Sequence, residues 1–211
     1  MSWDQSHGGK RRGYHHGNLR EALIEAALRL IGDKGPAGFT FAEAARAAGV
    51  SPAAPYRHFR DRDDLLADVA RRGFESFTAA LQAAWDDGRP TPGAALQRLG
   101  AAYLEFARNQ PASYAAMFEA GLRLADHPEL KAVADGAFAV LREACETLLA
   151  PWPGQRPPAL MVALHIWALS HGIASLFARG DAARRPLPMS PEELLEAGVL
   201  LYLDGLRGSR G

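Results

Sequence analysis

The sequence has little capacity for cysteine chemistry, because Cys145 is the single cysteine among 211 residues. One thiol cannot form an internal disulfide, which favours a reducing compartment. Residues 1–18 contain no apolar run of the kind found in a secretory signal, and are rich in His, Gly and Arg instead. We therefore expect a cytoplasmic protein.

The short motifs of many common enzymes are also missing. The sequence has no Gly-rich phosphate loop, no Gly-x-Ser-x-Gly, no His-Glu-x-x-His and no Cys-x-x-Cys. His15 and His16 are adjacent, but no Cys, Asp or Glu cluster with metal-ligand spacing accompanies them. We expect neither an enzyme nor a cofactor or metal site.

The chain has no net charge, yet its charges are unevenly distributed. Residues 1–72 contain 12 Lys and Arg against 9 Asp and Glu, whereas the remainder contains 12 against 15. A basic front half indicates an anionic partner for that half, although such an asymmetry alone is weak support for nucleic-acid binding.

No segment shows the sustained alternation of a β-strand, so we predict an all-α protein. Capping boxes begin at Asn18, Thr40 and Ser190, and Gly or Pro residues end the helical segments. About nine helices are predicted, over residues 19–33, 41–48, 52–58, 62–86, 92–109, 112–120, 128–149, 158–179 and 191–206.

The second and third predicted helices have the composition of a helix-turn-helix between Thr40 and Phe59. Small residues, among them Ala44 and Ala45, allow two helices to cross closely, and Gly49 tolerates the positive φ of a sharp turn. Val50 would anchor that turn in the core, and Ser51 would cap the second helix. A plain helical hairpin with a glycine turn would share many of these features.

The predicted second helix would present an exposed face to a DNA major groove. Its small N-terminal residues would let the helix end enter the groove, and longer side chains would reach flanking phosphates. Two helix N-termini, at Thr40 and Arg62, would offer free N–H groups to phosphates. The predicted DNA-binding residues are Thr40, Ser51, Pro52, Ala53, Ala54, Tyr56, Arg57, His58 and Arg62.

The string from Thr40 to Phe59, followed by Arg62-Asp-Asp-Leu-Leu66, resembles the DNA-binding domain of the TetR family of regulators. The resemblance covers about residues 18–77. It implies an all-helical homodimer with two recognition helices and a C-terminal domain that binds a small molecule. In that family the residues matching Thr40, Ala53, Tyr56, His58 and Arg62 typically contact DNA. Pro55 replaces the more usual aliphatic residue.

The segment Lys10-Arg11-Arg12 lies before this domain in a polar tail, residues 1–17. Such a basic tail can act as an arm that reaches a minor groove or the DNA backbone. A disordered, solubilising tail is the other interpretation. The sequence does not decide between the two.

Helix 158–179 is apolar on nearly every side, with no charged residue from Ala159 to Ala178. Its length suits a transmembrane span, but a buried helix has the same pattern, and two histidines argue against lipid. We expect no membrane partner. Together with helix 191–206 it would form a four-helix seam across a two-fold axis. The predicted dimer residues are Leu160, Leu164, Leu194, Val199, Leu201 and Tyr202.

The same helix carries Trp167, His171 and Gly172, which resemble the signature of the WHG type of TetR C-terminal domain. Trp167 and His171 would lie one turn apart on one face. A lone histidine there can equally be a hydrogen-bonded core residue. With neighbouring aromatic residues they could line an apolar pocket. The predicted ligand-binding residues are Phe74, Tyr103, Phe106, Tyr114, Phe118, Trp167 and His171.

These observations predict three segments: a flexible basic tail (1–17), a helix-turn-helix DNA-binding domain (18–77) and a ligand-binding and dimerisation domain (78–211). The predicted function is a sequence-specific transcription regulator, a repressor that a small-molecule effector releases from double-stranded DNA. The alternative is a helical small-molecule-binding or interaction protein that does not bind DNA.

Overall fold

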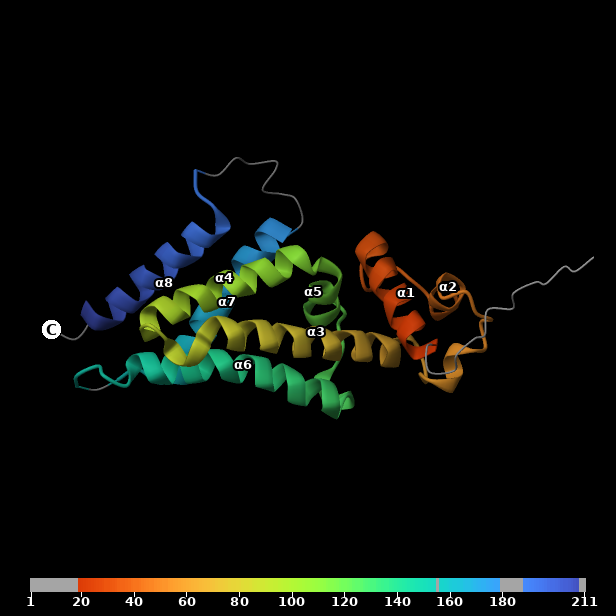
Figure 1. Ribbon diagram of the computed structural model, residues 1–211, viewed down its shortest axis with the longest axis horizontal. Helices are drawn as coiled ribbons and strands as arrows, with labels where there is room; N and C mark the ends of the chain where they lie inside the picture. Colours follow the sequence, from red (N-terminus) through yellow and green to blue (C-terminus); the bar gives the residue numbers. More distant parts are fainter. Residues whose placement is uncertain (1–18, 155, 179–187, 209–211) are drawn as a thin grey trace, which may run out of the picture.

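The computed structural model describes residues 19–154, 156–178 and 188–208, and the regular structure in these ranges is helical throughout (Figure 1). The predicted tail 1–17 and the predicted cap Asn18 lie outside the described residues. The elements are α1 (Leu19–Lys34), α2 (Phe41–Ala47), η1 (Pro55–Arg57), α3 (Arg62–Trp85), η2 (Asp86–Gly88), α4 (Pro92–Asn109), α5 (Pro111–Phe118), η3 (Leu124–Asp126), α6 (Pro128–Leu149), α7 (Ala159–Ala178) and α8 (Pro191–Gly208).

Most helices begin where their capping residues place them. Thr40 and Ser190 each form a complete capping box, in which the hydroxyl accepts from the backbone N–H of the Glu three residues later and that Glu accepts from the cap's own N–H. Asp61 caps α3 and Thr91 caps α4 through one hydrogen bond each, in which the side-chain oxygen accepts from the backbone N–H three residues later. Eight predicted helices are therefore confirmed, with bounds shifted by at most two residues.

The predicted helix over 52–58 is wrong. Within these residues only Pro55–Arg57 forms a short 3₁₀-helix, and turns precede it. Pro52 would stand at the first helical position, where an N–H has no partner within the helix, but Pro55 cannot donate the first intrahelical hydrogen bond, to the carbonyl of Ser51. Ala54 instead donates to the carbonyl of Ser51, three residues back, at 3.0 Å. The described part of the chain thus has eight α-helices rather than nine.

The helices form a small head at one end of a larger bundle (Figure 1). The head consists of α1, α2 and the segment 48–61, and the long helix α3 runs from it into the bundle. There α3 contacts α4, α5 and α6, and α5 also contacts α1. The predicted domain boundary at residues 77 and 78 falls within α3, so no linker separates the head from the bundle.

One hydrophobic core continues from α1 to α8. In the head, Leu23, Ala27 and Ile31 line one face of α1 and are buried with Phe39 and Phe59. In the bundle, Phe77 is completely buried on α3. Continuity of the core means that a change in the bundle can reach the head through packed side chains.

The apolar helix α7 packs within the bundle against α4, α6 and α8. Its segment Ala159–Phe177 is long and apolar enough to cross a membrane, but one such helix is also what the core of a soluble protein contains. Val162, Ala163 and Ile166 are buried on one side. Leu160, Leu164 and Leu176 are exposed on α7, so part of its apolar surface is not covered by the other described residues.

Replacing Phe77 with Ala tests this core. The ring packs 5.1 Å from Tyr103 and 4.9 Å from Phe106, centroid to centroid. Removing it leaves a cavity, so we expect the free energy of unfolding to fall by about 3–5 kcal/mol. Urea denaturation followed by circular dichroism measures this. The exposed Gln82 on the same helix is the control, and Gln82→Ala should change stability by less than about 0.5 kcal/mol. Equal stability of the two variants would contradict the packing.

Candidate nucleic-acid interface

The turn after α2 has the hydrogen bonds of a Schellman motif. Gly49 adopts a φ of 73°, in the left-handed region that favours glycine. Its N–H donates to the carbonyl of Arg46, and the N–H of Val50 donates to the carbonyl of Ala45, both at 3.0 Å. These bonds end α2 and redirect the chain toward the segment 51–59, which we call the recognition segment.

The recognition segment is held from inside by Pro55 and Phe59, both buried. The N–H groups of His58 and Phe59 donate to the carbonyl of Pro55 at 2.9 and 3.0 Å. These tight turns keep the outward side chains close together even though no α-helix forms. Pro55 therefore changes the shape of the segment but acts as its anchor.

The outward side of the recognition segment carries most of the predicted DNA-binding residues. Ala54 is half-buried, and the other side chains on this side are exposed: Ser51, Pro52, Ala53, Tyr56, Arg57 and His58. Tyr56 remains 64% exposed although its ring packs edge-on against Phe41 of α2, with centroids 5.0 Å apart. That contact orients the phenol without enclosing its hydroxyl, which can therefore reach a partner outside the protein.

Thr40 is exposed, but its side chain already has partners within the protein. Its hydroxyl accepts from the Glu43 N–H at 3.2 Å and donates to Glu43 Oε2 at 3.0 Å. A hydrogen bond from Lys34, followed by those from Thr40, lowers the pKa of Glu43 to about 2. A phosphate at this helix end would meet a carboxylate that is ionised at neutral pH, so the first role of Thr40 is to cap α2.

Arg62 is turned toward the protein. Its Nε donates to the carbonyl of Phe39 at 2.9 Å, its Nη2 donates to the carbonyl of Pro36, and the guanidinium lies 5.0 Å from the centre of the Phe39 ring. The arginine thus fixes the loop before α2 onto the start of α3. The predicted phosphate contact of Arg62 would have to be made in addition to these bonds.

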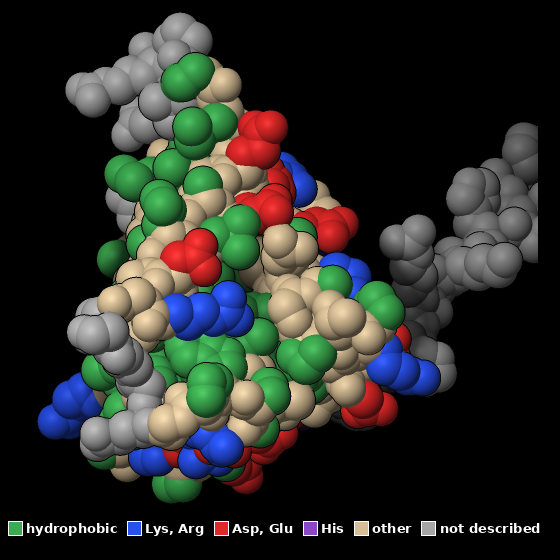
Figure 2. Space-filling model, turned by 90° about the vertical axis from the view of Figure 1, so that its left-hand side faces the viewer, with side chains coloured by type: hydrophobic (Ala, Val, Ile, Leu, Met, Phe, Trp, Pro, Cys, Tyr) green, Lys and Arg blue, Asp and Glu red, His purple; other side chains and the backbone are tan. Residues whose placement is uncertain are grey.

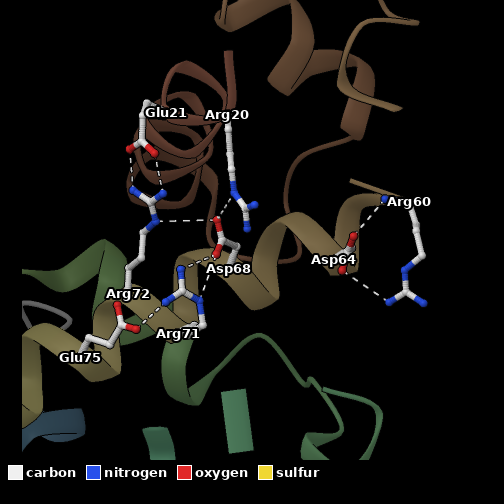
Figure 3. A network of polar contacts seen from close by, with 8 residues as sticks. All are labelled: Arg20, Glu21, Arg60, Asp64, Asp68, Arg71, Arg72 and Glu75. Atoms are coloured by element: carbon white, nitrogen blue, oxygen red, sulfur yellow. Dashed lines mark hydrogen bonds and ion pairs between the residues drawn. The ribbon is translucent and has the colours of Figure 1, made fainter. Parts of the chain in front are cut away.

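The head is joined to α3 by a network of ionic contacts around Asp68 (Figure 3). The Asp68 side chain is 5% exposed. Its Oδ2 accepts from Arg20 Nε of α1 at 3.1 Å, and its Oδ1 accepts from Arg71 Nη2 at 2.8 Å. Arg72 Nε lies 3.7 Å from Oδ2. One buried carboxylate thereby connects two helices.

A second ion pair reinforces this junction. Arg72 donates through Nη1 and Nη2 to the two carboxylate oxygens of Glu21 on α1, at 2.5 and 2.6 Å. Such a bidentate pair fixes direction as well as distance. Because Arg20 and Glu21 are adjacent on α1, both pairs hold the same end of that helix against α3 (Figure 3).

The sequence interpretation did not identify Asp68, Arg20, Glu21 or Arg72. A signal was present, since Asp68 interrupts an apolar stretch from Leu65 to Ala70. Charged residues are seldom fully buried unless they are paired. The arginines that pair with it could not be chosen from the sequence, because one of them lies 48 positions away.

In the bundle, the structure brings all seven predicted ligand-binding residues into one connected group. His171 Nδ1 lies 2.8 Å from the Tyr114 hydroxyl and 3.1 Å from that of Tyr103. The rings of the other members surround this trio. Phe118 packs against Phe74, Trp167 and His171. Phe77 packs against both Tyr103 and Phe106 and so joins them.

The polar trio in this group is uncharged at neutral pH. Burial raises the pKa of Tyr103 and of Tyr114, and burial lowers the pKa of His171. The cluster therefore offers uncharged hydrogen-bonding groups that are surrounded by aromatic rings. Such an environment suits an uncharged, largely apolar molecule with a polar group.

The predicted dimer residues lie on α7 and α8. Leu160, Leu164 and Leu201 are exposed, the last by 76%, whereas Leu194, Val199 and Tyr202 are half-buried. The Tyr202 hydroxyl is 2.7 Å from His165 Nδ1, which joins the two helices. Figure 2 shows hydrophobic side chains gathered on the end of the molecule where α8 lies.

Comparison with known proteins identifies similarities to both parts of the chain. The family model described as "Bacterial regulatory proteins, tetR family" matches residues 23–69, and "Tetracyclin repressor-like, C-terminal domain" matches residues 96–202. Among curated relatives, the HTH-type transcriptional regulator BetI of Rhizobium meliloti (strain 1021) is 48% identical over 52 residues, which are 25% of this chain and 26% of BetI. The match spans between about a quarter and a third of the length of the curated relatives.

The regulator AcrR of Shigella flexneri is 38% identical over 50 residues, 24% of this chain and 23% of AcrR. A solved structure of a protein with unknown function from Rhodococcus sp. RHA1 has a TM-score of 0.76 and 28% identity, and covers 93% of this chain and 98% of its own. The TetR family regulator PfmR from Thermus thermophilus has a TM-score of 0.67 at 22% identity, over 88% and 97% of the two chains, and shares the fold.

The variant Asp68→Asn tests the junction. Burial alone would raise the pKa of Asp68, but hydrogen bonds from Arg20 and Arg71 bring it below its usual value. We expect the free energy of unfolding at pH 7 to fall by about 3 kcal/mol, because the arginines lose a buried counter-charge. A group with a lowered pKa stabilises the fold above its unfolded-state pKa of about 4. The difference between the two proteins should therefore shrink as pH falls below that value.

Urea unfolding between pH 3 and pH 8 measures this difference. The control is Asp63→Asn, whose carboxylate is 64% exposed beside Arg62. An exposed pair contributes at most about 1 kcal/mol, so this variant should unfold nearly as the original does. An Asp68→Asn protein as stable as the original at pH 7 would show that the network does not hold the junction.

Proposed function

Because this chain belongs to the TetR family of bacterial regulators, we propose that it is a DNA-binding transcription regulator that reads DNA through the recognition segment. The observation that carries this proposal is the arrangement of residues 51–59, with Pro55 and Phe59 buried and Tyr56, Arg57 and His58 exposed on the other side. The family model of the tetR regulatory proteins matches residues 23–69, which include this segment. The proposal makes the chain a non-enzyme that acts in the cytoplasm.

Phosphate contacts supply most of the affinity in this proposal. Arg46, Arg57 and Arg60 are exposed near the recognition segment, and His58 and Tyr56 add donors. Pro52 and Ala53 are small and hold few groups that can hydrogen-bond to base edges. Backbone contacts fix the position of the protein on the duplex, and the remaining specificity comes from few base contacts and from DNA shape.

The regulator acts as a homodimer through the exposed apolar residues of α7 and α8. A contiguous patch of this kind on a soluble protein marks an interface, and an isologous one is expected for two identical chains. Two-fold symmetry would present two recognition segments to half-sites about one turn of DNA apart, roughly 34–36 Å.

An effector bound among the aromatic residues of the bundle would release the repressor from its operator. Tyr114 and Phe118 lie on α5, which contacts α1 of the head. Met117 on the same helix packs against α3 where Gly73 has no side chain, since a Cβ there would lie 2.8 Å from Met117 Sδ. Separating the rings to admit an uncharged ligand would move α5 and so tilt the head. A C-terminal domain of the WHG type, with Trp167 and His171 facing the ligand, fits this arrangement.

The alternative function is a helical small-molecule-binding protein that does not bind DNA. The aromatic cluster would serve both functions equally well. The exposed recognition segment, together with the exposed Arg46 and Arg60 on either side of it, is the feature that favours the regulator, because a purely ligand-binding protein has no use for it. Binding to duplex DNA therefore distinguishes the two.

Two single changes test the proposed DNA contacts. Tyr56→Phe removes only the hydroxyl and keeps the ring against Phe41, and His58→Ala removes the imidazole. Each should weaken binding to a random-sequence duplex by about 1.5 kcal/mol, or roughly tenfold, the value of a hydrogen bond to a charged group. Fluorescence anisotropy at low salt measures this, with Arg142→Ala on α6 as a control for net charge.

The affinity of the original protein for DNA should also fall steeply with added salt. Unchanged affinities, or affinity indifferent to salt, would contradict the proposal.

The dimer is tested with Leu201→Glu. This side chain is 76% exposed in the monomer, so a carboxylate there leaves the protomer folded but places charge in the proposed interface. Size-exclusion chromatography with light scattering should give twice the 22.7 kDa chain mass for the original protein, and the mass of one chain for the variant. Leu124→Glu, on an exposed residue of η3, should remain dimeric. A monomeric original protein would refute the interface.

A further inference from the structure

The exposed apolar face of α7 and α8, which we propose as the dimer interface, carries His165 within it. We propose that protonation of His165 controls dimerisation, so that the dimer is stable at neutral pH and dissociates into protomers in mild acid. This inference rests on the proposed homodimer, and it does not depend on whether the protein binds DNA.

His165 lies among exposed apolar side chains on α7. Leu160 and Leu164 are 52% and 51% exposed, and Leu176 is 67% exposed. His165 is itself exposed, and the sequence from Ala159 to Ala178 contains no Asp, Glu, Lys or Arg. A partner subunit that covers these leucines therefore also covers the imidazole and removes it from water.

Tyr202 of α8 fixes the position of this imidazole. The Tyr202 hydroxyl lies 2.7 Å from His165 Nδ1, and the two rings pack edge-on with centroids 5.1 Å apart. Burial raises the pKa of Tyr202, so its hydroxyl keeps the proton that it can donate to a neutral imidazole. The pair holds His165 at the seam between the two helices that form the proposed interface.

The other titratable groups of the helices packed against α7 supply no counter-charge for a protonated His165. On α6, Cys145 interacts with Tyr202, and burial raises the pKa of this thiol to about 12, so it is uncharged. Within the described ranges, no carboxylate forms an ion pair with His165. The charged side chains of α4 and α8 that are bound elsewhere are Arg98, Arg108, Glu192, Glu193, Glu196 and Asp204.

Protonation of His165 opposes association in two ways. A charged imidazolium is costly to remove from water into an apolar interface, whereas the neutral ring is tolerated there. A protonated Nδ1 must also donate to the Tyr202 oxygen, so the hydroxyl hydrogen has to turn toward another acceptor. In the separate protomer water can satisfy both groups, because His165 is exposed.

The proton therefore binds more tightly to the protomer than to the dimer. By linkage, the dimer weakens as pH falls through the range in which histidine side chains ordinarily become charged, between about pH 8 and pH 5. Since two-fold assembly presents both recognition segments to DNA, the same change would act on a DNA-bound dimer.

Sedimentation equilibrium of the full chain at about pH 8 and about pH 5.5, at equal ionic strength, measures the dissociation constant of the dimer. For the original protein we expect this constant to be at least about tenfold larger at the lower pH, the effect of one pKa unit of differential interaction. Circular dichroism should show unchanged helical content at both pH values.

His165→Asn removes the titrating group but keeps a side-chain oxygen that can accept from Tyr202, so its dissociation constant should not change with pH. His165→Leu extends the apolar face and should dimerise at least as tightly as the original protein at both pH values. This second variant keeps the test decisive, because a polar Asn in an interface can itself weaken association. The matched control is His127→Asn at the start of α6, which should retain the pH dependence of the original protein.

An original dimer whose dissociation constant is the same at both pH values would overturn the inference and leave the proposed dimer standing. PH dependence that persists in both His165 variants would overturn it in the same way. An original protein that is monomeric at either pH would instead refute the proposed dimer, and the inference with it.

Discussion

The buried carboxylate of Asp68 is the contact on which the connection between head and bundle depends. It lies near the start of α3, the helix that runs from the head into the bundle, and it accepts from Arg20 of α1. A buried charge of this kind is costly to leave unpaired, so the paired arrangement is strongly preferred over a loosened one. The head therefore turns as a unit with the first turns of α3, and the position of the recognition segment follows from the position of that helix.

This constraint gives the aromatic cluster a route to the DNA-binding surface. The cluster lies where α3, α4, α5 and α7 meet, and α5 contacts both α3 and α1. Packed cores shift between discrete arrangements more readily than they stretch. In the mechanism proposed above, a ligand that separates Tyr114 from Tyr103 would move α5, and the head would tilt together with the start of α3. The two recognition segments of a dimer would then change their separation.

Much of the fold could be predicted from the sequence because the helix ends carry local signals. The capping boxes at Thr40 and Ser190 and the glycine at position 49 need no distant partner, and their predicted positions are confirmed. The helix predicted over 52–58 is wrong, because Pro55 cannot donate the first intrahelical hydrogen bond of that segment. The ionic junction joins residues far apart in the chain, so no local pattern could predict which side chains meet.

The central claim is that residues 51–59 read DNA as a symmetric pair. Selection of bound sequences from a random duplex library with the purified full-length protein tests it most directly. We predict enrichment of an inverted repeat whose half-sites lie about one helical turn apart, roughly 10–10.5 bp or a multiple of it. A library that remains random after repeated selection, at salt concentrations where the protein is folded, would contradict the claim.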